Sequence, residues 1–124
     1  MKQVLATEQA PAAIGPYSQG IAAGETVYVS GQLPLDPATG AFPEGIAAQT
    51  AQSLKNIRAI LAQQGMTLAN VVKTTVFLAD INDFAEMNKV YGEFFTQPYP
   101  ARSAVQVAKL PKDAPLEIEC IAVK

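Results

Sequence analysis

Two stretches near the end of the chain decide its fold: Pro98-Tyr99-Pro100-Ala101-Arg102-Ser103-Ala104-Val105-Gln106-Val107 and Leu116-Glu117-Ile118-Glu119-Cys120-Ile121-Ala122-Val123. Their composition predicts two β-strands, over residues 102–109 and 116–123. Between them lies Pro111-Lys112-Asp113-Ala114-Pro115, which has the composition of a turn. We therefore expect the two strands to pair as a β-hairpin.

Such a hairpin places Arg102 close to two acidic residues, Glu117 and Glu119. A guanidinium group is always charged and can hold a carboxylate through two parallel hydrogen bonds. A carboxylate beside it can hold or activate a water molecule. The three side chains together predict a site for a small anionic molecule.

The rest of the chain contains further strands and two helices. Residues 1–7 predict a short edge strand, and residues 10–20 predict an ordered loop because they hold two prolines and two glycines. Residues 20–31 predict a hairpin that turns near Gly24 and Glu25. A long turn follows over residues 34–45. Residues 71–78 are rich in β-branched side chains and predict another strand.

Both predicted helices carry an apolar stripe at α-helical spacing. The first covers residues 46–64, and Gly65 follows at the position of a left-handed C-terminal cap. The second is capped by Asn82 or Asp83 and runs to about Phe95. The stripes consist of Ala47, Ala51, Leu54, Ile57 and Leu61 in the first helix and of Phe84, Met87, Tyr91 and Phe94 in the second.

This order of elements predicts one α+β domain over residues 1–124, with both helices on one face of a mostly antiparallel sheet. In the last strand, Ile118, Cys120 and Ala122 share one face. The opposite face holds Ile121 and Val123 beside the two glutamates, so neither face is wholly polar. A sheet with helices for only one of two partly apolar faces predicts an oligomer.

Charge and hydropathy exclude several classes of protein. The net charge is −2 and the pI is near 5.0, with no basic run, which argues against a nucleic-acid partner. No segment approaches the roughly 18–20 continuous apolar residues that span a bilayer, so we expect no membrane partner. The first eight residues lack the apolar core of a signal peptide, and we expect a cytoplasmic protein.

The chain has no histidine and a single cysteine, Cys120. Catalytic systems that pair serine or cysteine with histidine are therefore excluded, as are zinc sites. An all-oxygen Mg²⁺ or Ca²⁺ site stays open, although residues 80–83 lack the glycine and terminal glutamate of a calcium loop. No phosphate-binding glycine motif is present. We predict no metal and no cofactor, and chemistry that uses carboxylates, Tyr, Lys, Ser, backbone amides and water.

Short blocks along nearly the whole chain occur in the order that one known family shows. They are Ala10-Pro11-Ala12-Ala13-Ile14-Gly15-Pro16-Tyr17-Ser18-Gln19-Gly20, Val29-Ser30-Gly31-Gln32-Leu33-Pro34, Val72-Lys73-Thr74-Thr75-Val76-Phe77-Leu78, Asp80-Ile81-Asn82-Asp83-Phe84, and Pro100-Ala101-Arg102-Ser103 with Leu116-Glu117-Ile118-Glu119. In these blocks the chain resembles the RidA-type reactive-intermediate deaminases, also called the YjgF or L-PSP endoribonuclease-like family.

The resemblance implies a chorismate-mutase-like, ferredoxin-like layered fold and a homotrimer. In such a trimer three sheets form a central barrel, with clefts between neighbouring subunits. The implied activity is the hydrolysis of 2-imino or 2-enamino acids, such as 2-iminobutanoate and 2-iminopropanoate, to 2-keto acids and ammonia. The partners are then small 2-imino and 2-keto carboxylic acids.

The resemblance also implies roles for individual residues. Arg102 would clamp the substrate carboxylate, and Glu117 would hold the attacking water, with Glu119 as the competing candidate. Tyr17, supplied by the neighbouring subunit, would form a wall of the cleft. Further substrate-binding positions are Ser18, Ser30, Gly31, Asn88 and Ala104. Many relatives carry a cysteine at the position of Ala104, so a thiol cannot be essential here, and we expect Cys120 to be a small buried hydrophobe.

Two other functions stay open. The arginine-containing cleft could bind 2-keto acids or other small carboxylates without turning them over. The chain could also be an endoribonuclease or translation inhibitor, as an older name of the family says. The acidic pI and the lack of histidine argue against RNA cleavage, which commonly uses acids and bases of near-neutral pKa.

Overall fold

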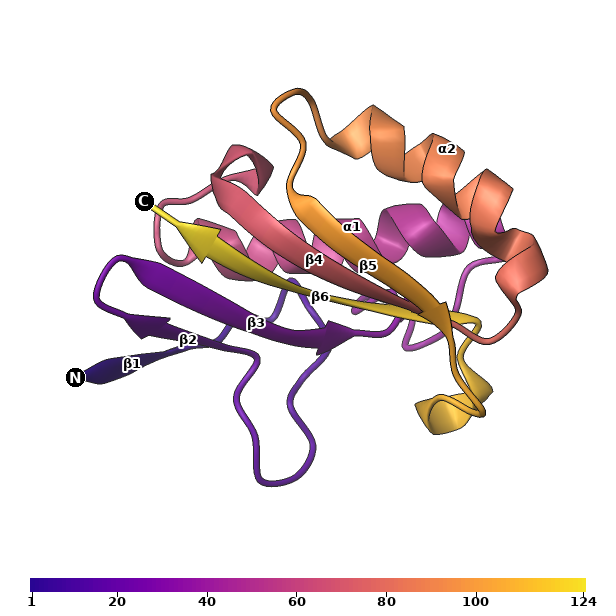
Figure 1. Cartoon of the computed structure of the whole chain (residues 1–124). Helices are drawn as coiled ribbons and strands as arrows, with labels where there is room; N and C mark the ends of the chain where they lie inside the picture. The colour runs from indigo at the N-terminus through magenta and orange to yellow at the C-terminus, as the bar shows by residue number, and fades with distance from the viewer.

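Six strands form one sheet in the order β1-β2-β3-β6-β4-β5 in the computed structural model, which describes residues 1–124 (Figure 1). The strands are β1 (Lys2–Leu5), β2 (Gly20–Ala23), β3 (Thr26–Gln32), β4 (Val71–Leu78), β5 (Ala101–Gln106) and β6 (Leu116–Val123). Neighbours are antiparallel except β4 and β5, which are parallel. The helices are α1 (Ile46–Ala62) and α2 (Phe84–Phe94), with short 3-10 helices η1 (Leu68–Asn70), η2 (Ile81–Asp83) and η3 (Pro111–Asp113). The predicted α+β class is confirmed.

The predicted hairpin between the last two strands is wrong. β5 lies outside β4 at the edge of the sheet, whereas β6 lies between β3 and β4. The helix α2 connects β4 to β5, and a crossover of this kind returns the chain parallel to the strand that it left. The linker after β5 then passes the end of β4, where Val107 N–H donates to the Leu78 carbonyl and Ala79 N–H donates to the Pro115 carbonyl.

Both helices cover the same face of the sheet (Figure 1). On β6 the predicted division is confirmed: Ile118, Cys120 and Ala122 are buried under the helices, and Glu119 on the other face is exposed. These three residues belong to a hydrophobic core cluster of 22 residues. The opposite face, called the open face below, carries no helix and exposes about half of Tyr28 and of Val105. Apolar surface on this face is therefore available to a further layer.

Helix α1 buries a stripe that differs in part from the predicted one. Leu54, Ile57 and Leu61 are fully buried as expected, but Ala47 is exposed. The buried face instead begins at Ile46 and includes polar residues, of which Asn56 donates from its amide to the Leu33 and Leu35 carbonyls. Those two bonds tie the long turn after β3 to the helix. The predicted cap at Gly65 is confirmed, because this glycine has a φ of 69°.

Helix α2 begins at Phe84, and the predicted Asp83 occupies its N-cap position without a side-chain capping bond. The side chain of Asp80 accepts a hydrogen bond from Asn82 N–H at the start of η2. Met87 and Tyr91 are buried, whereas Phe84 is only half-buried. Neither α1 nor α2 combines the length and the apolar character that a membrane span requires.

Candidate active site

The pleat of the sheet separates the predicted site residues into two groups. On β5, Arg102 pairs with Thr74, whose side chain is buried under the helices, so Arg102 also lies on the helix side. On β6, Glu117 and Glu119 pair with Phe77 and Thr75 on the open face. The expected closeness of Arg102 to the two glutamates is therefore wrong within one chain.

Arg102 is held by side chains of α2. The centre of its guanidinium lies 4.7 Å from the centroid of the Tyr91 ring and 5.4 Å from that of Phe84. Its Nη1 atom donates to Oδ1 of Asn88 over 2.7 Å. The cation–π contacts use none of the five N–H donors of the guanidinium, and the hydrogen bond to Asn88 uses one. Most of the donors are therefore free for a ligand. Arg102, Asn88 and the neighbouring Ala104 are called the arginine group below.

The Tyr91 ring is itself held in place by a hydrogen bond to β4. Its hydroxyl group and Oγ1 of Thr74 are 2.7 Å apart and share a buried hydrogen bond. Burial is the main cause that raises the pKa of Tyr91, so the phenol stays neutral under Arg102. The sequence pattern identified Tyr91 only as a core residue of the helix. Its contact with Arg102 follows from the parallel pairing of β4 with β5, which the sequence did not indicate.

Five other predicted residues gather at a cleft of about 980 Å³ beside the sheet. Tyr17, Ser30, Gly31, Glu117 and Glu119 all contribute to its lining. We call it the glutamate cleft. Four acids line it, Glu8, Asp36, Glu117 and Glu119, against a single base, Lys112. A cleft with this balance of charge repels a carboxylate unless a cation comes from elsewhere.

Glu117 lies directly against Gly31. A Cβ atom at position 31 would lie 2.7 Å from Cδ of Glu117, which is closer than real contacts allow. The β3–β6 register shifts between Val29 and Gln32, so Gly31 sits in an irregular part of the strand. Burial, followed by the charge of Glu119, raises the pKa of the Glu117 carboxyl above its ordinary value of 4.5. Glycine at position 31 thus makes room for a partly desolvated carboxylate.

One buried glutamine fixes the loop that carries Tyr17. Oε1 of Gln19 accepts from Thr7 N–H over 2.7 Å, and its Nε2 donates to the Pro11 carbonyl over 2.6 Å. Tyr17 is about half exposed at the rim of the cleft. The sequence prediction missed Gln19, for which the only signal was the single amide side chain in the loop over residues 10–20.

Ser18 and Ser30 serve the same loop. The Ser30 hydroxyl donates to the Ser18 carbonyl over 2.5 Å, and Ser30 N–H donates to the Gln19 carbonyl over 2.9 Å. Both donors of Ser30 are therefore used within the chain. Cys120 lies in the core, and burial raises its pKa to about 12, which makes it the buried hydrophobe that we expected. No cluster of three or more acidic or cysteine side chains is placed to hold a metal ion.

Fold and site together define a class of protein: a two-layer α+β domain with a braced arginine on one sheet face and a carboxylate cleft on the other. A model of the family described as Endoribonuclease L-PSP matches residues 7–124. The chain belongs to this family, as the sequence blocks predicted.

Relatives match over their whole length. A Salmonella typhimurium protein named 2-iminobutanoate/2-iminopropanoate deaminase is 54% identical, and the match covers 100% of this chain and 99% of that protein. An Escherichia coli protein of the same name is 52% identical with the same coverage. The crystal structure of the E. coli YjgF gene product has a TM-score of 0.94 at 52% identity, covering 98% of each chain. That of E. coli TdcF with bound serine also has a TM-score of 0.94, at 48% identity and 98% coverage of each chain.

Proposed function

We propose that this protein hydrolyses 2-imino acids and their enamine tautomers, such as 2-iminobutanoate and 2-iminopropanoate, to 2-keto acids and ammonia. The observation that carries the proposal is an arginine with free donors together with a partly desolvated glutamate, Arg102 and Glu117. Relatives over 50% identical along the whole chain are named for this reaction. The protein would act in the cytoplasm, on imines that pyridoxal-phosphate enzymes such as threonine dehydratase release.

The proposed site is completed by a second copy of the chain. Arg102 and Glu117 lie on opposite faces of one sheet, so a single chain cannot place both against one small molecule. The glutamate cleft has four acids against a single base, Lys112, and the arginine group on the edge strand β5 supplies a further cation for the substrate carboxylate. A homotrimer with its three open faces turned inward would bring each arginine group to the cleft of a neighbour, and would cover Tyr28 and Val105.

In this site Arg102 binds the carboxylate of the imino acid through two hydrogen bonds. Glu117 accepts a proton from a water molecule while the water oxygen forms a bond to C2 of the protonated imine. The proton then moves from Glu117 to the amino nitrogen of the resulting carbinolamine. The C–N bond breaks, ammonia leaves, and loss of the hydroxyl proton leaves the 2-keto acid. A raised pKa suits a carboxyl group that must accept and return a proton near neutral pH.

The other lining residues shape the site. Tyr17 forms a wall at the rim of the cleft, and Glu119 is the alternative water-binding carboxylate. Backbone groups of Gly31 and Ala104 can polarise the imine. Asn88 acts through Arg102, which it holds by a hydrogen bond, rather than as a separate contact to substrate.

A competition assay tests the proposal. Threonine dehydratase generates 2-iminobutanoate, and semicarbazide traps it as a semicarbazone. The wild-type protein should suppress semicarbazone formation, Arg102→Ala should not, and Lys55→Ala on the exposed side of α1 should behave as wild type. A folded wild-type protein with no effect on the trap contradicts the deaminase proposal.

A second candidate is a binding protein for small carboxylates. The structure of TdcF with bound serine favours it, because serine in that relative carries a carboxylate. Calorimetric binding of 2-ketobutanoate without any effect on the trap would support this candidate. Endoribonuclease activity, which the family description names, is less well supported because the chain is acidic and has no histidine.

A further inference from the structure

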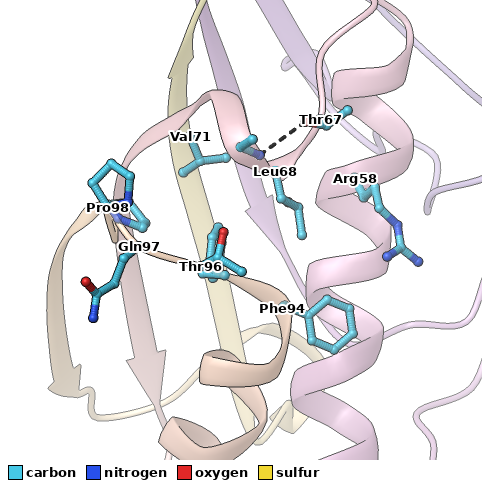
Figure 2. A pocket seen from close by; sticks show the side chains of 11 residues that line it. Arg58, Thr67, Leu68, Val71, Phe94, Thr96, Gln97 and Pro98 are labelled. Carbon is cyan, nitrogen blue, oxygen red and sulfur yellow. Dashed lines mark hydrogen bonds between the residues drawn. The ribbon is translucent and has the colours of Figure 1, made fainter.

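A second pocket lies away from the glutamate cleft, on the helix side of the molecule. It has a volume of about 340 Å³, and it lies between α1, η1 and the segment that joins α2 to β5 (Figure 2). Leu68, Val71 and Phe95 supply buried apolar surface to its lining. Figure 2 shows Arg58 and Phe94 on one side of the pocket and Gln97 and Pro98 on the other. Its size is at the lower end of the range for small-molecule sites.

The walls of this pocket are held in place without a ligand. Thr67 and Asn70 form a reciprocal cap around η1, in which Asn70 Oδ1 accepts from Thr67 N–H over 3.0 Å. The Asn70 amide also donates to the Val123 carbonyl at the end of β6. Pro98 and Pro100 stiffen the opposite wall. A preformed pocket binds with a small ordering cost, which favours a real ligand site over a transient gap.

The charge of the pocket is positive and unpaired. Arg58 lines it, and no acidic residue does. The chain contains one ion pair, between Lys109 and Asp113, so Arg58 has no carboxylate partner. Its guanidinium is instead held over the Phe94 ring, with 5.7 Å between Cζ and the ring centroid. Thr96 and Gln97 add a hydroxyl and an amide to the lining.

We propose that this pocket binds a small organic anion with an apolar or aromatic body. The carboxylate of such a ligand would pair with Arg58, and its body would lie against Leu68, Val71 and Phe95. Arg58 lines this pocket and Arg102 does not. The pocket residue Pro100 precedes Arg102 by two residues, so a short length of backbone connects the pocket to the arginine group. The proposal does not rest on the deaminase activity, and it can hold or fail independently of that activity.

Nuclear magnetic resonance tests the proposal with 3-phenylpropionate as the probe and its uncharged amide as the matched compound. The probe should shift the methyl signals of Leu68 and Val71, with a Kd below about 1 mM. Arg102→Gln should leave those shifts unchanged, because that arginine lies outside the pocket. Lys55→Gln on the same helix should also leave them unchanged, since this exposed lysine does not line it.

Arg58→Gln should weaken binding at least about tenfold, as should replacing the probe by the amide. Arg58 is exposed, so this variant should fold normally. Equal binding of the amide and the carboxylate would overturn the anion site. Absence of shifts at Leu68 and Val71 in the wild-type protein would overturn the pocket as a ligand site, whatever the result of the semicarbazone assay.

Discussion

The arginine group and the glutamate cleft are built in opposite ways. Arg102 extends from a regular strand and is clamped by an aromatic ring and an amide of one helix. Glu117 extends from an equally regular strand, but its surroundings are a strand irregularity at Gly31 and a loop held by Gln19. The guanidinium of Arg102 is thus positioned by side chains of one helix, whereas the Glu117 carboxylate fits because residue 31 has no side chain. The two halves should respond differently to substitution.

The largest effects should come from the two proposed catalytic residues, with different kinetic signatures. Arg102→Ala should raise KM for 2-iminobutanoate by about 100-fold or more, because a bidentate charged contact is lost. Glu117→Gln should lower kcat by about 10²–10⁴-fold with little change in KM, because the proton acceptor is lost. Steady-state kinetics in the semicarbazide assay measures both. Equal effects of both variants on KM alone would contradict the assigned division of roles.

Mixing the two inactive variants tests whether the halves meet across an interface. If each site takes Arg102 from one copy and Glu117 from its neighbour, random mixed trimers of Arg102→Ala and Glu117→Ala chains hold both residues in about a quarter of their sites. Unfolding and refolding an equimolar mixture should therefore restore about a quarter of the wild-type activity. Refolding each variant alone is the control. No recovery in mixtures that light scattering shows to be trimeric would place both residues in the same subunit.

The sequence predicted strands and helices well but not which strands are neighbours. Val71–Leu78, the hairpin that ends at Gly31 and the cap at Gly65 were predicted, because each depends on local composition. The predicted pairing of the last two strands was wrong, because a turn-like linker does not show whether it closes a hairpin or passes another strand. In α1 the alanine at position 47 fitted the apolar period but lies in solvent, because a methyl group contributes little to the choice of the buried face.

The sequence predicted which residues belong to the site but not how they are arranged in space. Every residue of the glutamate cleft that carries the proposal was named, but the division of the set between two sheet faces depends on the position of β5. Gly31 was predicted as the end of a hairpin strand, and its conformation is not left-handed. The close approach of Glu117, which a single sequence does not reveal, is what requires a glycine there.

Gly31→Ala should therefore reduce activity through Glu117. The added methyl group would push the carboxylate away, and we expect kcat to fall by about 10-fold or more while KM changes little. Gly92→Ala is the matched control, because nothing lies within 4 Å of a Cβ atom at that exposed helix position. The control should keep full activity and gain up to about 1 kcal/mol of stability. Full activity of Gly31→Ala would contradict the proposal that a glycine at position 31 is needed to make room for the Glu117 carboxylate.

A smaller effect should follow from removing the brace of Arg102. Tyr91→Leu removes the ring under the guanidinium and should raise KM about three- to tenfold, because a cation–π contact is worth about 1 kcal/mol. Tyr91→Phe keeps the ring but leaves the buried Thr74 hydroxyl without its partner. That variant should lose about 1–2 kcal/mol of stability with KM unchanged. Chemical denaturation and kinetics on both variants separate bracing from packing.

The smallest effect concerns the stability of the Glu117 site as pH changes. The pKa of Glu117 is higher in the folded than in the unfolded protein. Its contribution to the free energy of unfolding is therefore favourable below the unfolded pKa near 4.5, and it is lost as the pH rises through the folded-state pKa. Glu117→Gln should then be more stable than wild type at pH 7, by less than about 1 kcal/mol because the carboxyl is only half-buried. The difference should vanish below pH 4.5. A less stable variant at pH 7 would show that a neighbouring cation outweighs burial.

The hydrogen bonds of Gln19 also bear on the timing of catalysis. Because a single buried amide ties Thr7, Ala10 and Pro11 together, we expect the segment that carries Tyr17 to move with the core rather than as a hinged lid. Turnover should then not wait for a slow opening step, and the amide hydrogen of Ser30, which bonds to the Gln19 carbonyl of this loop, should exchange with solvent as slowly as the other amide hydrogens of β3. An enzyme that hydrolyses short-lived imines benefits from a cleft that is always open, because the imine reacts spontaneously during the time that a closed lid would exclude it.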